Sequence, residues 1–131
     1  MHYYVVTTSV HTTASICDYL DERATADDTV TVVAVSPAGD SDARRDAQEA
    51  LNVAPVRLAT VDSVRTDHLE LQADEPPARP LLEMATTAEA DEILVTAGEG
   101  LSKTASDVSP LVESLLENAS RPVVVLPAPE L

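Results

Sequence analysis

Residues Ala90 to Leu126 read ADEILVTAGEGLSKTASDVSPLVESLLENASRPVVVL and contain the pattern that decides the fold. Apolar runs at Ile93–Val95 and Pro122–Leu126 predict two strands. Between them a polar loop leads to Ser109–Pro110, which predicts the start of a helix. A polar loop between a strand and a helix N-terminus is a common phosphate site in α/β proteins, because unpaired backbone N–H groups and the helix dipole favour an anion there. The stretch therefore predicts a strand-loop-helix-strand unit with a position suited to an anion.

The chain before this stretch alternates strands and helices in the same way. Further strands are predicted at residues 3–8, 30–35 and 64–71. Five strands alternating with four helices predict a doubly wound α/β domain, in which parallel strands are joined by right-handed crossovers. We expect a single domain over residues 1–131, with ligands outside the carboxyl ends of its strands.

Capping residues predict where the helices begin. Thr12 or Thr13 is predicted to cap a first helix that reaches about Ala24, and Ser41 or Asp42 a second helix. Because proline disrupts a helix interior, Pro55 leaves two alternatives for the residues after it, a final helical turn or a short strand; we favour the helix.

The third helix is predicted from prolines and an apolar stripe. Residues 74–77 read DEPP and are expected to open this helix, with Pro80 still in its first turn. Its apolar stripe is predicted at Leu81, Leu82, Met84 and Ala85.

Composition excludes several classes of partner. The chain is 44% hydrophobic but only 2% aromatic, so its core is expected to consist of aliphatic side chains. The net charge is −15 and Lys103 is the only lysine, which argues against nucleic acid and anionic membranes as partners. Carboxylates spread along the chain are typical of a halophilic surface, where salt screens their repulsion. With no signal peptide or membrane-spanning run in the sequence, we expect a cytoplasmic protein.

No catalytic or metal-binding constellation emerges from the sequence. His2, His11 and His68 lack the spacing of metal ligands, and Cys17 is expected to be a packed thiol. The sequence contains no G-x-S-x-G elbow, P-loop or dinucleotide-binding fingerprint. We therefore predict neither an enzyme nor a metal site.

Three segments together resemble the universal stress protein family. They are DEPPARPLLEMA at residues 74–85, ADEILV at 90–95 and VESLLENASRPVVVLP at 112–127. The resemblance covers essentially the whole chain and implies an open parallel five-stranded sheet of order 3-2-1-4-5 with four helices. This Rossmann-like fold is also that of the adenine nucleotide alpha hydrolases, and many members of the family bind ATP at the carboxyl edge of the central strands.

The resemblance assigns positions in the loop after the fourth strand, where the family typically has G-x-x-G, a spacer and then G-S or G-T. Ser109 stands where the family has its last glycine, while Thr96 and Glu99 stand at the first two. Gly98 and Gly100 flank the Glu99 position. Glycines in such a loop let the backbone approach phosphate oxygens, whereas Glu99 places a carboxylate where a triphosphate would lie.

Two further positions follow from the resemblance. Thr7 replaces an aspartate at the end of the first strand, and Val35 fits the position that contacts adenine. Lys103 lies within the loop and offers one cation for a phosphate. The candidate nucleotide site therefore comprises Thr7, Val35, Thr96, Gly98, Gly100, Lys103 and Ser109.

The main functional hypothesis is a universal stress protein-like regulatory protein that acts by binding and homodimerisation, with a degenerate ATP site. The alternative is a nucleotide sensor that uses a loop rebuilt over residues 96–110; a weak nucleotide hydrolase is a third hypothesis. ATP is thus a possible ligand, and no cofactor is certain. The terminal strand with Val123, Val124 and Val125 is expected to form the dimer contact, with shielding of this edge by the following tail as the alternative.

Overall fold

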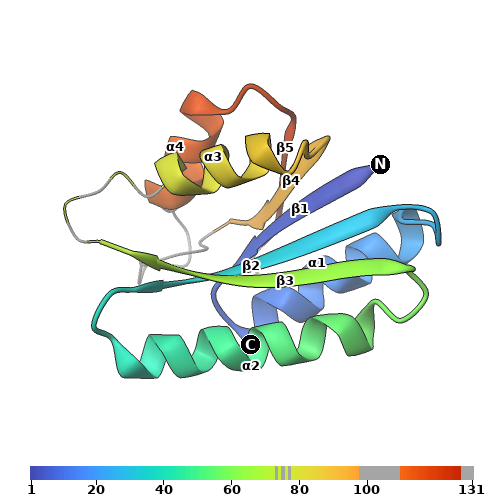
Figure 1. Ribbon diagram of the computed structural model, residues 1–131, viewed down its shortest axis with the longest axis horizontal. Coiled ribbons are helices and arrows are strands. Elements are labelled where there is room, and N and C mark those ends of the chain that lie inside the picture. Colours follow the sequence, from blue (N-terminus) through green and yellow to red (C-terminus); the bar gives the residue numbers. More distant parts are fainter. Residues whose placement is uncertain (73, 75, 77, 98–109, 128–131) are drawn as a thin grey trace.

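The computed structural model describes residues 1–72, 74, 76, 78–97 and 110–127 as a parallel sheet covered by helices on both faces (Figure 1). The elements in chain order are β1 (His2–Thr7), α1 (Val10–Arg23), β2 (Thr29–Pro37), α2 (Ser41–Arg57), β3 (Ser63–Leu71), α3 (Ala78–Thr87), β4 (Glu92–Thr96), α4 (Pro110–Asn118) and β5 (Val123–Leu126). The strand order is β3-β2-β1-β4-β5, and every pairing is parallel. The predicted architecture and strand order are therefore confirmed.

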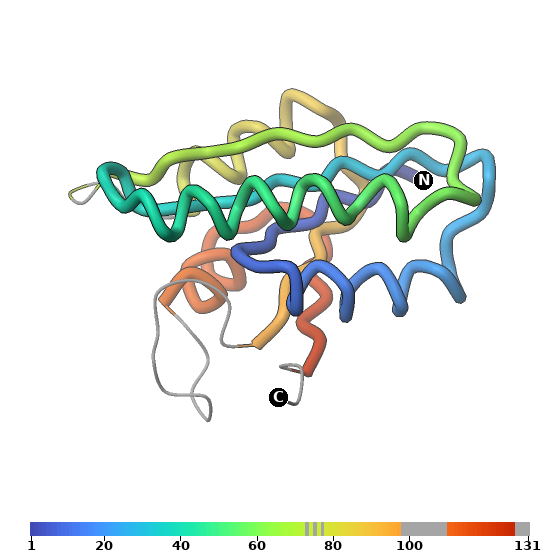
Figure 2. Tube along the Cα trace, turned by 90° about the horizontal axis from the view of Figure 1, so that it is seen from below, coloured from blue at the N-terminus to red at the C-terminus, as the bar shows by residue number. Residues whose placement is uncertain are grey.

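The helices divide into two layers. Figure 1 shows α3 and α4 above the sheet and α1 and α2 below it, and Figure 2 shows α1 and α2 running side by side under the strands. Right-handed crossovers require this division, because the chain moves from β1 toward β3 and then returns past β1 to β4 and β5. Within the described ranges, no helix combines the length and apolar character needed to cross a membrane.

Two aliphatic clusters fill the space between the layers. Tyr3 and Val5 of β1 belong to the cluster between the sheet and helices α1 and α2. Tyr4 and Val6 belong to the cluster between the sheet and helices α3 and α4. Because side chains alternate across a strand, β1 contributes to both clusters. Leu94 of β4 is fully buried in the first cluster, as a strand covered on both faces requires.

The first strand ends at Thr7, one residue before the predicted end, and the cap of α1 is Ser9 rather than Thr12 or Thr13. The Ser9 Oγ accepts the backbone N–H of Thr12 at 3.3 Å, and the Thr12 hydroxyl reaches back to the Ser9 backbone N–H at 3.3 Å. Thr12 and Thr13 thus lie inside the first turn, where their hydroxyls donate to the Ser9 carbonyl. The prediction was wrong because it placed the cap too far from the strand.

The cap of α2 is Asp40, so the prediction of Ser41 or Asp42 was wrong by one or two residues. Gly39 has φ +85°, a conformation that glycine adopts without strain, and it turns the chain so that Asp40 is the last residue before the helix. The Asp40 carboxylate accepts the N–H of Ala43 at 3.0 Å.

The helical alternative after Pro55 is confirmed, because α2 continues through Pro55 to Arg57. Pro55 is exposed in the last turns of the helix, and beyond it the Leu58 N–H still donates to the Ala54 carbonyl at 3.0 Å. The proline thus removes one hydrogen bond near the end of the helix without ending it.

The third helix begins at Ala78, after residues 74–77 rather than within them. The Arg79 N–H donates to the Pro76 carbonyl at 3.2 Å, so Pro76 belongs to a turn that leads into the helix. Pro80 lies in the first turn, as predicted, where its missing N–H has no intrahelical partner to lose. The fourth helix begins at Pro110, and Ser109 lies outside the described residues.

Replacement of Leu115 by alanine is expected to lower the free energy of unfolding by about 2–5 kcal/mol, because this α4 side chain is fully buried and its loss leaves a cavity. Leu116→Ala on the same helix is the matched control, since that side chain is 51% exposed, and we expect a change below about 0.5 kcal/mol. Urea unfolding at constant KCl measures both. Equal losses would contradict the packing of α4 described above.

Candidate functional site

A cleft of about 280 Å³ opens at the carboxyl edge of the sheet. The chain leaves β1 toward α1 on one face and leaves β4 toward the opposite face, so the connections diverge at this edge. Ten residues from both helical layers and from the strand ends line the cleft: Thr8, Ser9, Val35, Ser36, Pro37, Ala43, Asp46, Leu71, Pro110 and Leu111. The cleft thus lies where doubly wound sheets bind ligands.

One wall of the cleft is apolar. Val35 and Leu71 come from the paired strands β2 and β3, and Leu111 from the first turn of α4; each is less than a tenth exposed. Pro37 and Pro110 extend this wall. A flat apolar ring such as a nucleobase fits a surface of this kind. Val35, the predicted adenine position, therefore lies in the wall of the cleft.

The other wall carries hydroxyls and a carboxylate. Ser9 already caps α1, and the Ser36 hydroxyl lies 2.8 Å from the His68 Nε2. Asp46 projects from α2 as an exposed carboxylate at the cleft. A carboxylate accepts hydrogen bonds from an amino group but repels a phosphate. The described walls therefore favour a base over a phosphate.

Thr7 is turned into the protein and does not line the cleft. Its side chain is fully buried, and its Oγ1 lies 2.6 Å from the Thr12 Oγ1 and 2.8 Å from the Thr13 Oγ1. The same hydroxyl donates to the Ser9 carbonyl at 3.2 Å. Where the resemblance implies an aspartate facing the ligand, this chain has a closed hydroxyl cluster that fixes the β1–α1 connection.

Thr96 occupies the corresponding end of β4. Val5 pairs with Leu94, so Thr7 and Thr96 each lie two residues further along neighbouring strands. Thr96 is fully buried and, like Thr7, does not line the cleft. The remaining predicted site residues, Gly98, Gly100, Lys103 and Ser109, lie outside the described residues, as does Glu99. Of the three predicted residues that the structure describes, Val35 lies in the cleft wall, whereas Thr7 and Thr96 do not.

Sequence reasoning missed Asp46, Leu71 and Leu111. Leu71 is the last residue of β3, and a search of every strand end would have found it. Asp46 lies one turn beyond the start of α2 as an exposed carboxylate, and nothing in the linear sequence distinguishes it from the other carboxylates of that helix. Leu111 follows Pro110 in the first turn of α4. The sequence predicted an anion site at this helix start and gave no reason to expect an apolar ligand contact there.

The Cys17 thiol and the histidines nearest the core are held by the surrounding structure. Burial raises the pKa of the Cys17 thiol to about 11, so the thiolate that reacts with electrophiles is scarce at neutral pH. His68 contacts Ser36, and His2 lies between Thr31 and the Ala88 carbonyl. Across the described ranges, no three His, Cys, Asp or Glu side chains gather to hold a metal ion.

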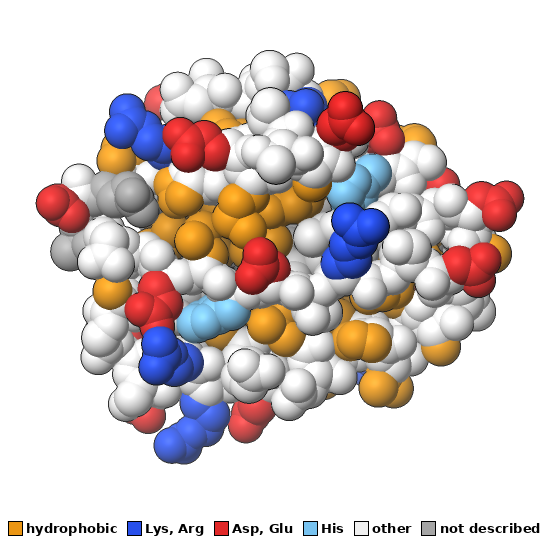
Figure 3. All heavy atoms as spheres, in the orientation of Figure 1, with side chains coloured by type: hydrophobic (Ala, Val, Ile, Leu, Met, Phe, Trp, Pro, Cys, Tyr) orange, Lys and Arg blue, Asp and Glu red, His pale blue; other side chains and the backbone are white. Residues whose placement is uncertain are grey.

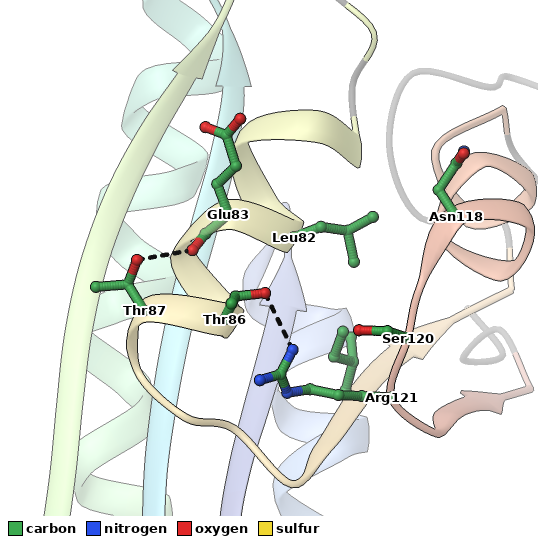
Figure 4. A pocket seen from close by; sticks show the side chains of 8 residues that line it. Leu82, Glu83, Thr86, Thr87, Asn118, Ser120 and Arg121 are labelled. Atoms are coloured by element: carbon green, nitrogen blue, oxygen red, sulfur yellow. Dashed lines mark hydrogen bonds between the residues drawn. The ribbon is translucent and has the colours of Figure 1, made fainter.

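A second, shallower hollow of about 520 Å³ lies between α3 and α4 (Figure 4). Arg121 reaches toward α3, where its Nη1 donates to the Thr86 Oγ1 at 3.0 Å and its Nε to the Ala90 carbonyl at 2.5 Å. These bonds connect the start of β5 to the end of α3. The hollow lies at the amino ends of β4 and β5, opposite the predicted ligand edge, and Arg121 there has a structural role.

Comparison with solved structures finds the same fold in universal stress proteins. One from Burkholderia pseudomallei is 20% identical, with a TM-score of 0.60 over 97% of this chain and 96% of that one. One from Archaeoglobus fulgidus in complex with dAMP is 17% identical, with a TM-score of 0.62 over 95% and 96%. One from Arabidopsis thaliana with AMP bound is 14% identical, with a TM-score of 0.60 over 97% and 90%. No family model matches the sequence, and no curated protein does. The chain therefore has the universal stress protein fold over nearly its whole length.

Replacing Thr7 by valine is expected to destabilise the protein by about 1–3 kcal/mol, because the change removes a fully buried hydroxyl that contacts the Thr12 and Thr13 hydroxyls and the Ser9 carbonyl. Thr60→Val, at an exposed position in a turn, serves as the control and should change stability by less than about 0.5 kcal/mol. Urea unfolding provides the measurement. An unchanged midpoint for Thr7→Val would show that the cluster is not structural.

Proposed function

We propose that this chain is a universal stress protein-like regulatory protein of the cytoplasm, which acts by binding and association rather than by catalysis. The cleft at the diverging connections after β1 and β4 carries this proposal, since its Val35–Leu71–Leu111 wall suits a nucleobase. The similar folds that hold dAMP and AMP support a nucleotide-type ligand. Among the described residues no cluster of His, Cys, Asp or Glu is placed to hold a metal ion for hydrolysis.

Within this proposal, adenosine or AMP fits the cleft better than ATP. At about 280 Å³ the cleft lies just below the usual range of ligand pockets, about 300–1,000 Å³, so it accommodates a base with its sugar. Asp46 can accept the adenine amino group, whereas the same carboxylate and a net charge of −15 oppose a triphosphate. The Thr7 hydroxyl is committed to the cluster and offers nothing to a ligand. The proposed ATP site is therefore degenerate, because it keeps the surface for a base but opposes the triphosphate.

The ligand preference predicts the result of calorimetric titrations with adenosine, AMP and ATP in molar KCl. We expect adenosine to bind at least as tightly as ATP, and Ala43→Leu to weaken adenosine about tenfold or more by filling the cleft. Ala59→Leu, at an exposed position outside the cleft, is the matched control. If ATP binds more than about tenfold tighter than adenosine, the alternative of a phosphate site rebuilt over residues 96–110 replaces this proposal.

The association we propose is a homodimer through β5. The Ile93 N–H donates to the Pro122 carbonyl at 2.9 Å and the Ala97 N–H to the Leu126 carbonyl at 2.7 Å. Alternate residues of a parallel strand bond to the same neighbour, so the backbone groups of Val123 and Val125 point away from β4. In the described part of the chain no strand covers this edge. A second copy can pair with it about a two-fold axis.

Val125→Pro is expected to produce a folded monomer, because it removes an outward N–H without disturbing the bonds between β5 and β4. Val125→Thr retains both the N–H and the β-branched shape, and should retain the dimer. Light scattering in molar KCl gives the mass, and circular dichroism checks the fold. A dimer that survives Val125→Pro, with the fold intact, would place the interface elsewhere.

A further inference from the structure

A wide groove lies between α3 and the strands β2 and β3. The groove measures about 760 Å³ and is open to solvent. Leu69 of β3 and Pro80 and Met84 of α3 give it apolar walls, and Figure 3 shows hydrophobic side chains exposed in a hollow between α3 and β3. It is separate from the nucleotide cleft, since the two share no lining residue. The groove arises because α3 covers the inner strands and leaves part of β2 and β3 uncovered.

Tyr4 lines this groove with a hydroxyl that has no hydrogen-bond partner among the described residues. The residue is only 2% exposed and lines the groove, and its hydroxyl forms no hydrogen bond with any described residue. Among the described residues the buried side-chain oxygen left without a hydrogen bond is the Glu92 Oε1, so the Tyr4 hydroxyl is not sealed inside the protein but reaches the open groove. Burial, aided by the charge of Asp67, raises the pKa of Tyr4 to about 12. The hydroxyl therefore stays neutral and can both donate and accept.

Carboxylates from both walls face the groove. Asp67 comes from β3 and Glu83 from α3, and neither forms an ion pair with a described residue. Arg65 is the cation among the described lining residues, so negative charge exceeds positive there. The net charge of the whole chain, −15, adds to the negative potential. A cation is favoured in this groove, and a phosphate or carboxylate ligand is disfavoured.

Thr31 lines the groove, and its hydroxyl is already bonded to His2. A carbonyl only accepts, so the His2 Nδ1–H donates to the Ala88 carbonyl at 3.0 Å. In the neutral ring, Nε2 then accepts from the Thr31 hydroxyl at 2.7 Å. The His2 ring meets the Tyr4 ring edge-on, with 6.5 Å between centroids. Thr31 is thus already engaged, whereas the Tyr4 hydroxyl has no hydrogen-bond partner among the described residues and is open to a ligand in the groove.

We propose that this groove binds a small organic amine, with the apolar part on Leu69 and Met84 and the ammonium group between the Tyr4 hydroxyl and the Asp67 carboxylate. A neutral Tyr4 oxygen accepts one N–H, and Asp67 accepts another as a charge-assisted bond. Glu83 on the facing helix adds attraction across the groove. The site is independent of nucleotide binding, because the nucleotide cleft lies at the carboxyl edge with a different set of residues.

Three probes with the same aromatic body test the proposal: 2-phenylethylammonium, 2-phenylethanol and phenylacetate. Methyl NMR in KCl of fixed concentration follows Leu69 and Met84. We expect the ammonium probe to shift these methyl signals and to bind about fivefold or more tightly than the alcohol, with phenylacetate weakest. The ammonium affinity should fall as KCl is raised, since salt screens the carboxylates.

Two isosteric variants separate the hydroxyl from the carboxylate. Tyr4→Phe and Asp67→Asn should each weaken the ammonium probe by about three- to tenfold. Asp62→Asn, at an exposed carboxylate outside the groove, is the control and should leave the affinity unchanged. Tyr4→Phe should not lower the urea midpoint, because the hydroxyl has no partner to lose, so weaker binding cannot be attributed to unfolding.

Four results would overturn the proposal. Equal affinity for the ammonium and alcohol probes would remove the role of charge, and an Asp67→Asn variant that binds normally would remove the role of that carboxylate. Shifts confined to the Val35 and Leu71 methyls would assign the probes to the nucleotide cleft. Leu69 and Met84 signals that depend on protein concentration without any probe would make a second copy of the chain the occupant.

Discussion

The burial of β1 on both faces is the constraint on which the rest of the structure depends. Tyr3 and Val5 anchor one aliphatic cluster, and Tyr4 and Val6 anchor the other, so neither helical layer can detach without exposing a face of this strand. The chain has almost no aromatic residues, and branched aliphatic side chains fill both clusters. Such side chains suit parallel strands, which need apolar cover on both faces. The same central position puts the end of β1 at the point where the helical connections diverge. Stability and the location of the candidate site thus have a common origin.

The hydroxyl cluster at the end of β1 shows how one position changes the character of the cleft. Thr7 is fully buried and bonds to the first turn of α1, so the β1–α1 connection is fixed by neutral groups. An aspartate there would need solvent, a cation or a ligand donor to remain charged. Threonine removes that requirement and also removes the ligand contact that the family resemblance implies. The described cleft retains apolar surface at Val35, Leu71 and Leu111 but has a carboxylate at Asp46. In a chain with a net charge of −15, this combination opposes phosphate more than it opposes a base.

The sequence predicted those features that depend on periodicity and order, and failed on those that depend on a single turn. Alternating apolar runs predicted all five strands, and the chain order predicted the crossovers. The observed caps, Ser9 and Asp40, differ from the predicted ones. Several neighbouring Ser, Thr and Asp residues can each accept the same N–H groups, so the sequence does not single out the cap. The strand ends identified Val35, and alternation along β1 places Thr7 on the same face as Tyr3 and Val5. The hydroxyl contacts that keep Thr7 from a ligand come from the first turn of α1, and no linear pattern contains them. The groove at Tyr4 was equally invisible, because it depends on how far α3 extends over the sheet.

Two cavities of different chemistry coexist on one sheet because the helices of the upper layer cover it incompletely. At the carboxyl edge, the start of α4 closes a small cleft against β2 and β3, which favours a flat uncharged ring. Farther back along the sheet, α3 leaves a wider groove lined by Asp67 and Glu83 together with apolar side chains. The described lining of each cavity contains an unpaired carboxylate, so attraction of anions would need charge from elsewhere. An acidic protein in a high-salt medium can tolerate such carboxylates, because screening at short Debye lengths limits their repulsion. A ligand that brings its own positive charge would gain from them directly, whereas under the proposed function a nucleotide would bind through its base. The carboxylates therefore disfavour anionic ligands and favour cationic ones, a distinction that the shape of the cavities does not make.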